Sequence, residues 1–253
     1  AWDLNDRGRI DDLKQFITKS PSPFYAHIHM LGTHGFKFKP TIPVFSKDQK
    51  QSKPWMTDFY DDAILDYDRY AAEIVAFLKS QNHYENTLII FTSDHGKAWR
   101  INETTPLLFR FPKMQYHGVR TYNSQHTDIA PTILQYLNLD IPVWMDGQSL
   151  LVNDRDKLAP IFAVQKSQSL PNERGWHRVV SPKPPFYTLG SISASYCHMQ
   201  YRLSLADNRL SSDPIKGHTQ PCHESLLPSK EEVRKVLITH LKQAGYDTAS
   251  IEL

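Results

Sequence analysis

The spacing of apolar residues predicts two long helices in the first third of the chain. Apolar side chains recur every three or four residues over residues 8–19 and again over residues 57–80, which is the repeat of one helix face. The apolar positions are Ile10, Leu13, Phe16 and Ile17 in the first helix, and Tyr60, Ile64, Tyr67, Ala71, Ile74, Val75 and Leu78 in the second. Residues 41–56 between them are polar and contain prolines, so we expect a surface segment.

Short apolar runs predict strands around and after these helices. Residues 24–30 form one such run and lead into a loop containing Gly32 and Gly35. The continuous run LIIFTSD at 88–94 suits a parallel strand covered on both faces, and PLLFRFP at 106–112 is a second candidate. A helix is predicted at 127–139. This alternation of strands and helices argues for an α/β sheet with helices on its faces.

The sequence changes character after about residue 151. Proline and serine become frequent, and short strand-like pieces follow at 160–165, 186–193 and 199–206. The segment 229–245 has the pattern of an amphipathic helix, with a capping Ser229, a Glu232 three residues later and a closing Gly245. We therefore expect two regions: an α/β region over residues 1–151 and a small α+β subdomain with an antiparallel sheet over residues 152–253.

Composition narrows the functional classes. The 253 residues include 29 basic and 27 acidic side chains, a formal charge of +2, and the basic residues are scattered, so nothing favours nucleic-acid binding. No apolar run approaches the roughly 18 residues that would span a bilayer. The first residue is not Met, which is consistent with an internal or processed start. Cys197 and Cys222 allow either one disulfide or two thiols, and their spacing does not choose between them.

Polar residues that can bind a cation follow the predicted strand at 88–94. Asp94 and His95 stand at its end, before Gly96 and Lys97. Ligands of open α/β sheets bind beyond the carboxyl ends of the strands. A carboxylate and a neutral imidazole suit Zn²⁺, Mn²⁺ or Ca²⁺ with further carboxylate ligands. Two ligands do not make a complete site, and hydrolysis would also need a nucleophile.

Other polar clusters have simpler interpretations. We expect Asp61, Asp62, Asp66 and Asp68 to form the solvated face of the 57–80 helix, and His27 and His29 to pack in the core or on a sheet face. His126 and Asp128 stand where a helix cap belongs. The spacing of His198, His218 and His223 around the cysteines fits no zinc signature well.

Five stretches carry a resemblance to a known family. They are PSPFYAHIHMLGTHGFKFKP, YDDAILDYDRYAAEIVAFLKSQNHYENTLIIFTSDHG, TPLLFRFP, HTDIAPTILQYLNLDIP and MDGQSLL, in this order across residues 21–151. Together they resemble the later part of the catalytic domain of the alkaline phosphatase superfamily, and within it the sulfatases and the phosphoethanolamine transferases. The resemblance implies the later portion of an alkaline-phosphatase-like sheet flanked by helices over residues 1–151, followed by the small C-terminal subdomain.

The resemblance also implies roles for individual residues. Asp94 and His95 fall on the metal-binding pair of the family, and His34 in THGF falls on a histidine that contacts the sulfate or phosphate group. Sulfatases carry an active-site lysine in the following loop. Because that interval is short here, either Lys97 substitutes for it or the lysine is absent. The implied cofactor is a divalent cation: Ca²⁺ in a sulfatase, or Zn²⁺ or Mn²⁺ in a phosphoesterase.

The paired acidic ligands and the nucleophile of the family do not precede Asp94 in this sequence. We therefore expect a fragment, a chain whose partner is the missing N-terminal half, or an inactive relative, and we expect this chain alone to be inactive. For the intact protein the resemblance implies metal-dependent hydrolysis of sulfuric esters of small molecules or glycans, in an extracytoplasmic (periplasmic, secreted or lysosomal) location. The alternatives are a phosphoester hydrolase, a phosphoethanolamine transferase and a protein that only binds or scaffolds.

Overall fold

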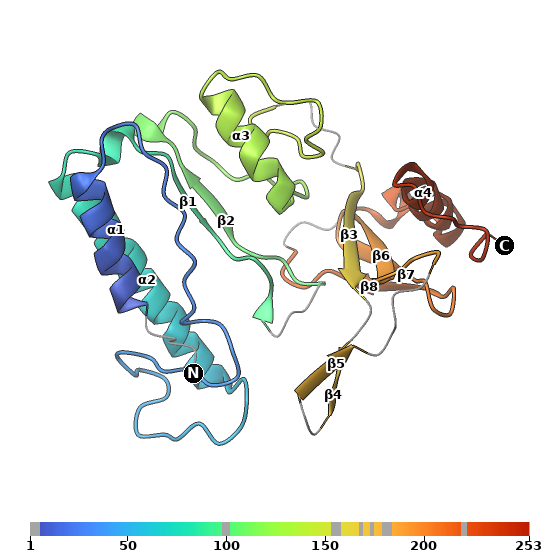
Figure 1. The fold of residues 1–253 in the computed structure, drawn as a ribbon, viewed down its shortest axis with the longest axis horizontal. Helices are drawn as coiled ribbons and strands as arrows, with labels where there is room; N and C mark the ends of the chain where they lie inside the picture. Colours follow the sequence, from blue (N-terminus) through green and yellow to red (C-terminus); the bar gives the residue numbers. More distant parts are fainter. Residues whose placement is uncertain are drawn as a thin grey trace. The chain divides into compact units, whose positions relative to one another are not determined.

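A computed structural model of the chain describes residues 6–97, 102–152, 158–166, 169–172, 175–178, 184–218 and 222–252 (Figure 1). The chain divides into two compact units. The first unit comprises Ala1–Ser93, Lys97–Trp99 and Pro106–His117, and the second comprises Asp94–Gly96, Arg100–Thr105 and Gly118–Leu253. The predicted division of domains near residue 151 stays a prediction.

Two helices, α1 (Arg7–Lys19) and α2 (Thr57–Ser80), pack side by side in the first unit (Figure 1). Both helices confirm the sequence prediction, although Phe16 and Ile64 of the predicted apolar stripes are exposed. Their contact is apolar, because the stripes of the two helices face each other, and it buries Ile10, Leu13, Ile17, Ile74 and Leu78. The guanidinium of Arg7 and the ammonium of Lys14 on α1 both donate to the carboxylate of Glu73 on α2, so an ion-pair network borders the apolar contact.

Strands β1 (Ile89–Thr92) and β2 (Leu107–Arg110) form a two-stranded antiparallel sheet in which Thr92 pairs with Leu107. The expected parallel strand covered on both faces is therefore wrong for the described residues: β1 pairs only with β2, and all four of its residues are half-buried. An apolar run indicates that a strand is buried but carries no information about its direction. The 3₁₀ turns η1 (Tyr84–Asn86) and η3 (Pro112–Met114) flank the pair.

Residues 24–30 do not form the predicted strand. Phe24, Ile28 and Met30 instead pack against the apolar contact of α1 and α2, while His27 and His29 are exposed rather than packed in a core. The segment has the alternating pattern of a strand because one side of it faces the helices. Among the described strands, none is paired with this segment in a ladder.

The predicted helix at 127–139 is present as the turn η4 (His126–Asp128) and helix α3 (Ile129–Tyr136) of the second unit. Asp128 is fully buried, and its carboxylate accepts the backbone N–H groups of Gln125 and Gln148, both at 2.9 Å. This capping role agrees with the sequence prediction. The imidazole of His126 itself is exposed.

The second unit also contains the predicted antiparallel sheet, with strand order β3-β6-β7-β8. Its strands are β3 (Ile161–Lys166), β6 (Leu189–Tyr196), β7 (Met199–Ser204) and β8 (Leu210–Pro214). The sequence did not predict β8, nor the separate hairpin of β4 (Ser169–Asn172) and β5 (Gly175–Arg178). The turn η5 (Glu224–Leu226) precedes the last helix.

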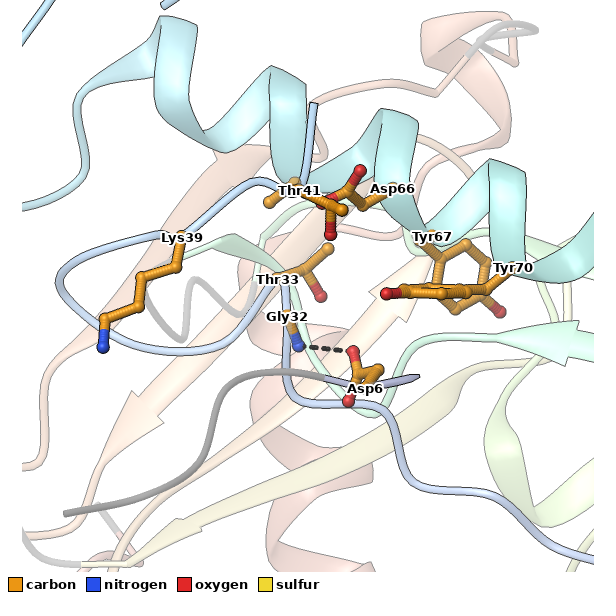
Figure 2. Close-up of a pocket in the computed structure, with 9 residues that line it drawn as sticks. Asp6, Gly32, Thr33, Lys39, Thr41, Asp66, Tyr67 and Tyr70 are labelled. Atoms are coloured by element: carbon orange, nitrogen blue, oxygen red, sulfur yellow. Dashed lines mark hydrogen bonds between the residues drawn. The ribbon is translucent and has the colours of Figure 1, made fainter. Parts of the chain in front are cut away.

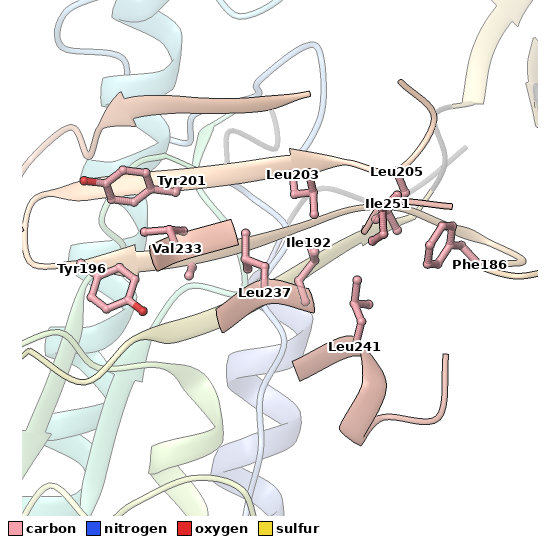
Figure 3. Close-up of a cluster of buried hydrophobic side chains, with 11 residues drawn as sticks. Phe186, Ile192, Tyr196, Tyr201, Leu203, Leu205, Val233, Leu237, Leu241 and Ile251 are labelled. Atoms are coloured by element: carbon pink, nitrogen blue, oxygen red, sulfur yellow. The ribbon is translucent and has the colours of Figure 1, made fainter. Parts of the chain in front are cut away.

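Helix α4 (Lys230–Gln243) packs on one face of this sheet (Figure 3). Val233, Leu237 and Leu241 of the helix meet Ile192 and Leu203 of the central strands, and each of the five is at most 1% exposed. Ser229 and Glu232 form the predicted capping box. This core of the second unit is thus built by the ordinary pairing of an amphipathic helix with one sheet face.

Cys197 and Cys222 are joined by a disulfide, which resolves the alternative that their spacing left open. Cys197 lies between β6 and β7, and its carbonyl oxygen accepts the side-chain amide of Asn123 at 2.8 Å. The bridge fastens the β6–β7 turn to the segment that leads into η5. None of the helices in the described part of the chain has the length and apolar character needed to cross a membrane.

Candidate metal centre

Asp94 and His95 follow the end of β1 after one residue, Ser93, where the strand gives way to a loop. Nε2 of His95 lies 3.7 Å from Oδ2 of Asp94. The carboxylate is 61% exposed and the imidazole 29% exposed, so both are accessible to a ligand from solution. The structure therefore brings these two predicted ligands together.

A local hydrogen bond orients the imidazole. Nδ1 of His95 lies 2.8 Å from the carbonyl oxygen of Gly96. A carbonyl can only accept, so in the neutral ring Nδ1 carries the proton and Nε2 keeps its lone pair. That lone pair is on the nitrogen that approaches Asp94, and a backbone carbonyl on the other nitrogen is the usual support of a metal-binding histidine.

The spacing of the two donor atoms fits a shared cation. Two ligands about 2.1 Å from a tetrahedral ion lie about 3.4 Å apart, a few tenths of an ångström below the observed separation. Within the residues that the structure describes, no set of three or more His, Cys, Asp or Glu side chains converges to hold a metal. The donor chemistry therefore fits a divalent cation with two ligands supplied by Asp94 and His95.

Asn102 and Thr104, which follow Asp94 and His95 in the chain, pair with Lys216, just after β8 in the second unit. Lys216 donates its backbone N–H to the carbonyl of Asn102 at 2.8 Å, and its own carbonyl accepts the N–H of Thr104 at 2.9 Å. The next residue, Gly217, has φ +81°, which favours glycine, and a Cβ there would lie 2.4 Å from the hydroxyl oxygen of Thr104.

His34 stands at the end of a tight turn in the first unit. Its backbone N–H donates to the carbonyl of Leu31 at 2.9 Å, and Gly35 follows with φ +106°. Asp6 accepts the N–H groups of Leu31 and Gly32, each at 2.8 Å, so the start of the turn is also held. The imidazole of His34 is half-buried.

Lys97 belongs to the first unit, and its ammonium lies 4.4 Å from the centroid of the Tyr60 ring on α2. A cation over an aromatic face is attracted by the ring quadrupole. The structure thus places Lys97 against α2, and its catalytic role stays a prediction. Of the four predicted site residues, Asp94 and His95 are in contact, whereas His34 and Lys97 belong to the other unit.

Two acidic residues of α2 are buried, contrary to the expectation of a solvated face. Asp62 is fully buried and Asp66 is 9% exposed. The carboxylate of Asp62 accepts the N–H groups of Val44, Phe45 and Ser46, each at 3.0 Å, and that of Asp66 accepts the N–H of Thr41. Most of their donors are backbone groups of the loop before α2, which no sequence pattern indicates.

A signal for these buried carboxylates was nevertheless available. Phe59, Asp62, Ala63 and Asp66 are spaced i, i+3, i+4 and i+7, so both acids lie on the same helix face as the apolar Phe59 and Ala63. An acid inside an apolar stripe must find hydrogen-bond donors when that stripe is buried. Asp68, outside the stripe, is exposed as predicted.

The sulfatase family model matches residues 4–139, which is more than half of the chain and includes β1, the Asp94–His95 pair and His34. This chain belongs to the sulfatase family. The match confirms the resemblance that the sequence motifs indicated.

Similar proteins come from several branches of the superfamily. An N-acetylglucosamine-6-O-sulfatase of Bacteroides thetaiotaomicron is 28% identical over 36% of this sulfatase-family chain and 19% of its own length. A lipoteichoic acid synthase of Staphylococcus saprophyticus is 23% identical over 91% of this chain and 39% of its own length. A solved structure from work on glycosaminoglycan metabolism by Bacteroides thetaiotaomicron has a TM-score of 0.66 at 18% identity, covering 98% of this chain and 60% of that one.

The chain spans between 15% and 39% of the length of these and similar curated relatives. The structural likeness establishes the mixed α/β fold of the family. The activity and substrate of the whole protein belong to the proposal below.

Proposed function

We propose that the protein containing this chain is a metal-dependent hydrolase of sulfuric esters. The observation that carries the proposal is the approach of His95 Nε2 to Asp94 Oδ2, at 3.7 Å, within the segment matched by the sulfatase family model. A carboxylate beside an imidazole is a suitable half of a cation site.

Each of the candidate residues has a separate role in the proposed reaction. Asp94 supplies carboxylate oxygen, and His95 supplies Nε2, to hold a divalent cation. When bound, such a cation supplies positive charge that offsets the anionic ester and lowers the pKa of a nucleophile. His34 donates a hydrogen bond to an oxygen of the ester group, which stabilises the charge that develops there. The remaining ligands and the nucleophile are contributed by residues other than these.

Phosphoryl chemistry is the second candidate, and two observations favour it. Calcium prefers oxygen ligands, whereas an imidazole suits Zn²⁺ or Mn²⁺, the ions expected of a phosphoesterase. In addition, a phosphoglycerol transferase I of Xanthomonas campestris is 26% identical over 66% of this chain. The distinguishing measurement is the metal content of the full-length protein together with its relative turnover of an aryl sulfate and an aryl phosphate.

The disulfide supports an extracytoplasmic location for the protein, because disulfides persist in oxidising compartments. A sulfated glycan or small molecule is the proposed substrate class, in keeping with the sulfatase relative whose name specifies a sulfated N-acetylglucosamine. Periplasmic, secreted and lysosomal locations all meet the redox requirement.

The test compares full-length wild type with Asp94→Ala and the matched control Asp140→Ala, which removes an exposed carboxylate of the second unit. Elemental analysis gives bound metal, and turnover of an aryl sulfate gives activity. We expect Asp94→Ala to lose both and Asp140→Ala to keep both. Full metal content and activity in Asp94→Ala would overturn the metal assignment. A wild type with neither metal nor turnover would instead identify an inactive relative.

A further inference from the structure

Asp6 occupies the N-cap position of α1 but does not cap the helix. Its side chain makes no hydrogen bond to the first turn of α1, although Asp is among the best residues for that role. The carboxylate is nevertheless buried, with 4% of Asp6 exposed. A buried carboxylate requires donors, so its partners identify what it does in the fold.

Those partners lie on the segment that ends in His34. Oδ1 of Asp6 accepts the N–H of Leu31 at 2.8 Å. Oδ2 accepts the N–H of Gly32, also at 2.8 Å (Figure 2). Arg9 donates to the same carboxylate at 3.2 Å and balances its charge. Charge-assisted hydrogen bonds of this kind are shorter and stronger than neutral ones.

The two bonds fix the start of a turn whose end is His34. Leu31 receives the backbone N–H of His34 on its carbonyl, at 2.9 Å, while its own N–H is held by Asp6. Leu31 is therefore fastened on both sides, and only Thr33 separates the fastened Gly32 from His34. A displacement at Asp6 would be passed to the backbone of His34 through a single intervening residue.

We propose that Asp6 is a positioning residue for His34 in the reaction of the protein. The inference rests on the proposed function, in which His34 contacts the ester group. Asp6 touches no reacting atom in this scheme: it sets the backbone of the turn and thereby the direction from which the imidazole reaches the ester.

Two other buried carboxylates bind residues 41–46, which follow the turn of His34 in the chain, and they provide a matched control. Asp62 binds residues 44–46 and Asp66 binds Thr41, both beyond the turn of His34. A purely structural role would make Asp6→Asn and Asp62→Asn equivalent, because each removes one carboxylate from one segment. A positioning role makes them different.

The experiment uses the full-length protein with Asp6→Asn, Asp62→Asn, His34→Ala and the double variant Asp6→Asn/His34→Ala. Turnover of an aryl sulfate and of an aryl phosphate gives kcat/KM. The imidazole resonance of His34, assigned by its loss in His34→Ala, reports the environment of the ring by NMR without reference to activity. Thr33→Gly loosens the same turn from within while leaving Asp6 in place, and decides the matter if Asp6→Asn does not fold.

We expect Asp6→Asn to shift the His34 resonance and to lower kcat/KM on the order of 10- to 100-fold, the effect of a small misplacement of a reacting group. Asp62→Asn should leave the resonance and kcat/KM near those of the wild type. The double variant should be no slower than His34→Ala, because coupled residues are not additive. Thr33→Gly should act in the same direction as Asp6→Asn.

An unshifted His34 resonance in Asp6→Asn, or a double variant whose loss is the product of the two single losses, would overturn the positioning role. Normal activity of His34→Ala, with the resonance shift still present in Asp6→Asn, would remove the proposed role of His34 in the reaction while retaining the structural coupling. The two failures are therefore distinguishable.

Discussion

The hydroxyl of Ser46 donates to Oδ2 of Asp62 at 2.6 Å, and both residues are buried. The same carboxylate accepts three consecutive backbone N–H groups from the loop before α2. Burial raises the pKa of Asp62, and the hydrogen bonds from Ser46 and the backbone outweigh it, so that the pKa lies below its ordinary value. One ionised side chain thus holds a loop that has no helix or strand of its own.

Asp62→Ala should destabilise the protein by about 2–4 kcal/mol, because it leaves buried donors without an acceptor. The measurement is the free energy of unfolding in denaturant at neutral pH. Asp68→Ala removes an exposed carboxylate from the same helix and should change stability by no more than about 0.5 kcal/mol. Equal effects of the two substitutions would show that the buried network does not hold the loop.

The lowered pKa of Glu73 predicts that the protein loses stability in acid. Hydrogen bonds from Arg7 and then Lys14 lower the pKa of Glu73 to about 2, against an ordinary value of 4.5. Its contribution is therefore complete above pH 4.5 and is lost as the pH falls through about 2. Glu73→Gln should flatten the dependence of unfolding free energy on pH between 5 and 2. An unchanged slope would exclude Glu73 as a source of acid sensitivity.

His218 predicts a second, milder acid sensitivity. Burial lowers the pKa of His218, and the neighbouring His198, with ring centroids 6.3 Å apart, lowers it further. The folded state therefore binds the proton less readily than the unfolded state, whose ordinary pKa is 6.5. The free energy of unfolding is therefore highest above pH 6.5, and it falls as the pH drops below 6.5 because the unfolded state takes up the proton first.

Thermal unfolding at pH 7.5 and 5.5 measures this effect. Replacing His218 with Gln should reduce the difference between the two melting temperatures. The control His223→Gln changes an exposed imidazole next to Cys222 of the disulfide, and it should leave the difference unchanged. The same difference in His218→Gln as in the wild type would assign the acid response to other groups.

Reduction of the disulfide should destabilise the second unit. Cys197 and Cys222 are separated by 25 residues in the sequence. A bridge that closes a loop of this size stabilises by about 3.5 kcal/mol in the chain-entropy account. Unfolding with and without reductant measures the contribution, and Cys197→Ser/Cys222→Ser should behave like reduced wild type and show no response to reductant.

Sequence reasoning predicted the elements whose signals are local. Helices α1, α2 and α4 were found because an amphipathic stripe and a capping box are written in consecutive residues. The contact of Asp94 and His95 is also local, since the two are neighbours at the end of a strand. The direction of β1 and the absence of a strand at 24–30 depend on partners elsewhere in the chain, which periodicity does not specify.

The buried acidic residues show the same difference between local signals, which the sequence contains, and distant partners, which it does not specify. Asp62 and Asp66 were assigned to a solvated face because charge usually indicates exposure, although their helical spacing set them among apolar residues. Asp6 stands at the N-cap position of α1, yet the backbone groups that it binds are 25 and 26 residues away. In each case backbone N–H groups of distant residues are among the donors, and every residue type except proline can supply them.

The pairing of Lys216 with Asn102 and Thr104 bears on how this chain can be divided. A shortened chain ending after α3 would retain β1, Asp94, His95 and most of the segment matched by the family model, and by sequence it would look like a self-sufficient piece. It would nevertheless release the far end of the loop that leaves the two ligands. The chain around Lys216 therefore holds residues 102–104 by backbone hydrogen bonds. A domain boundary placed at the end of the family match would remove this contact.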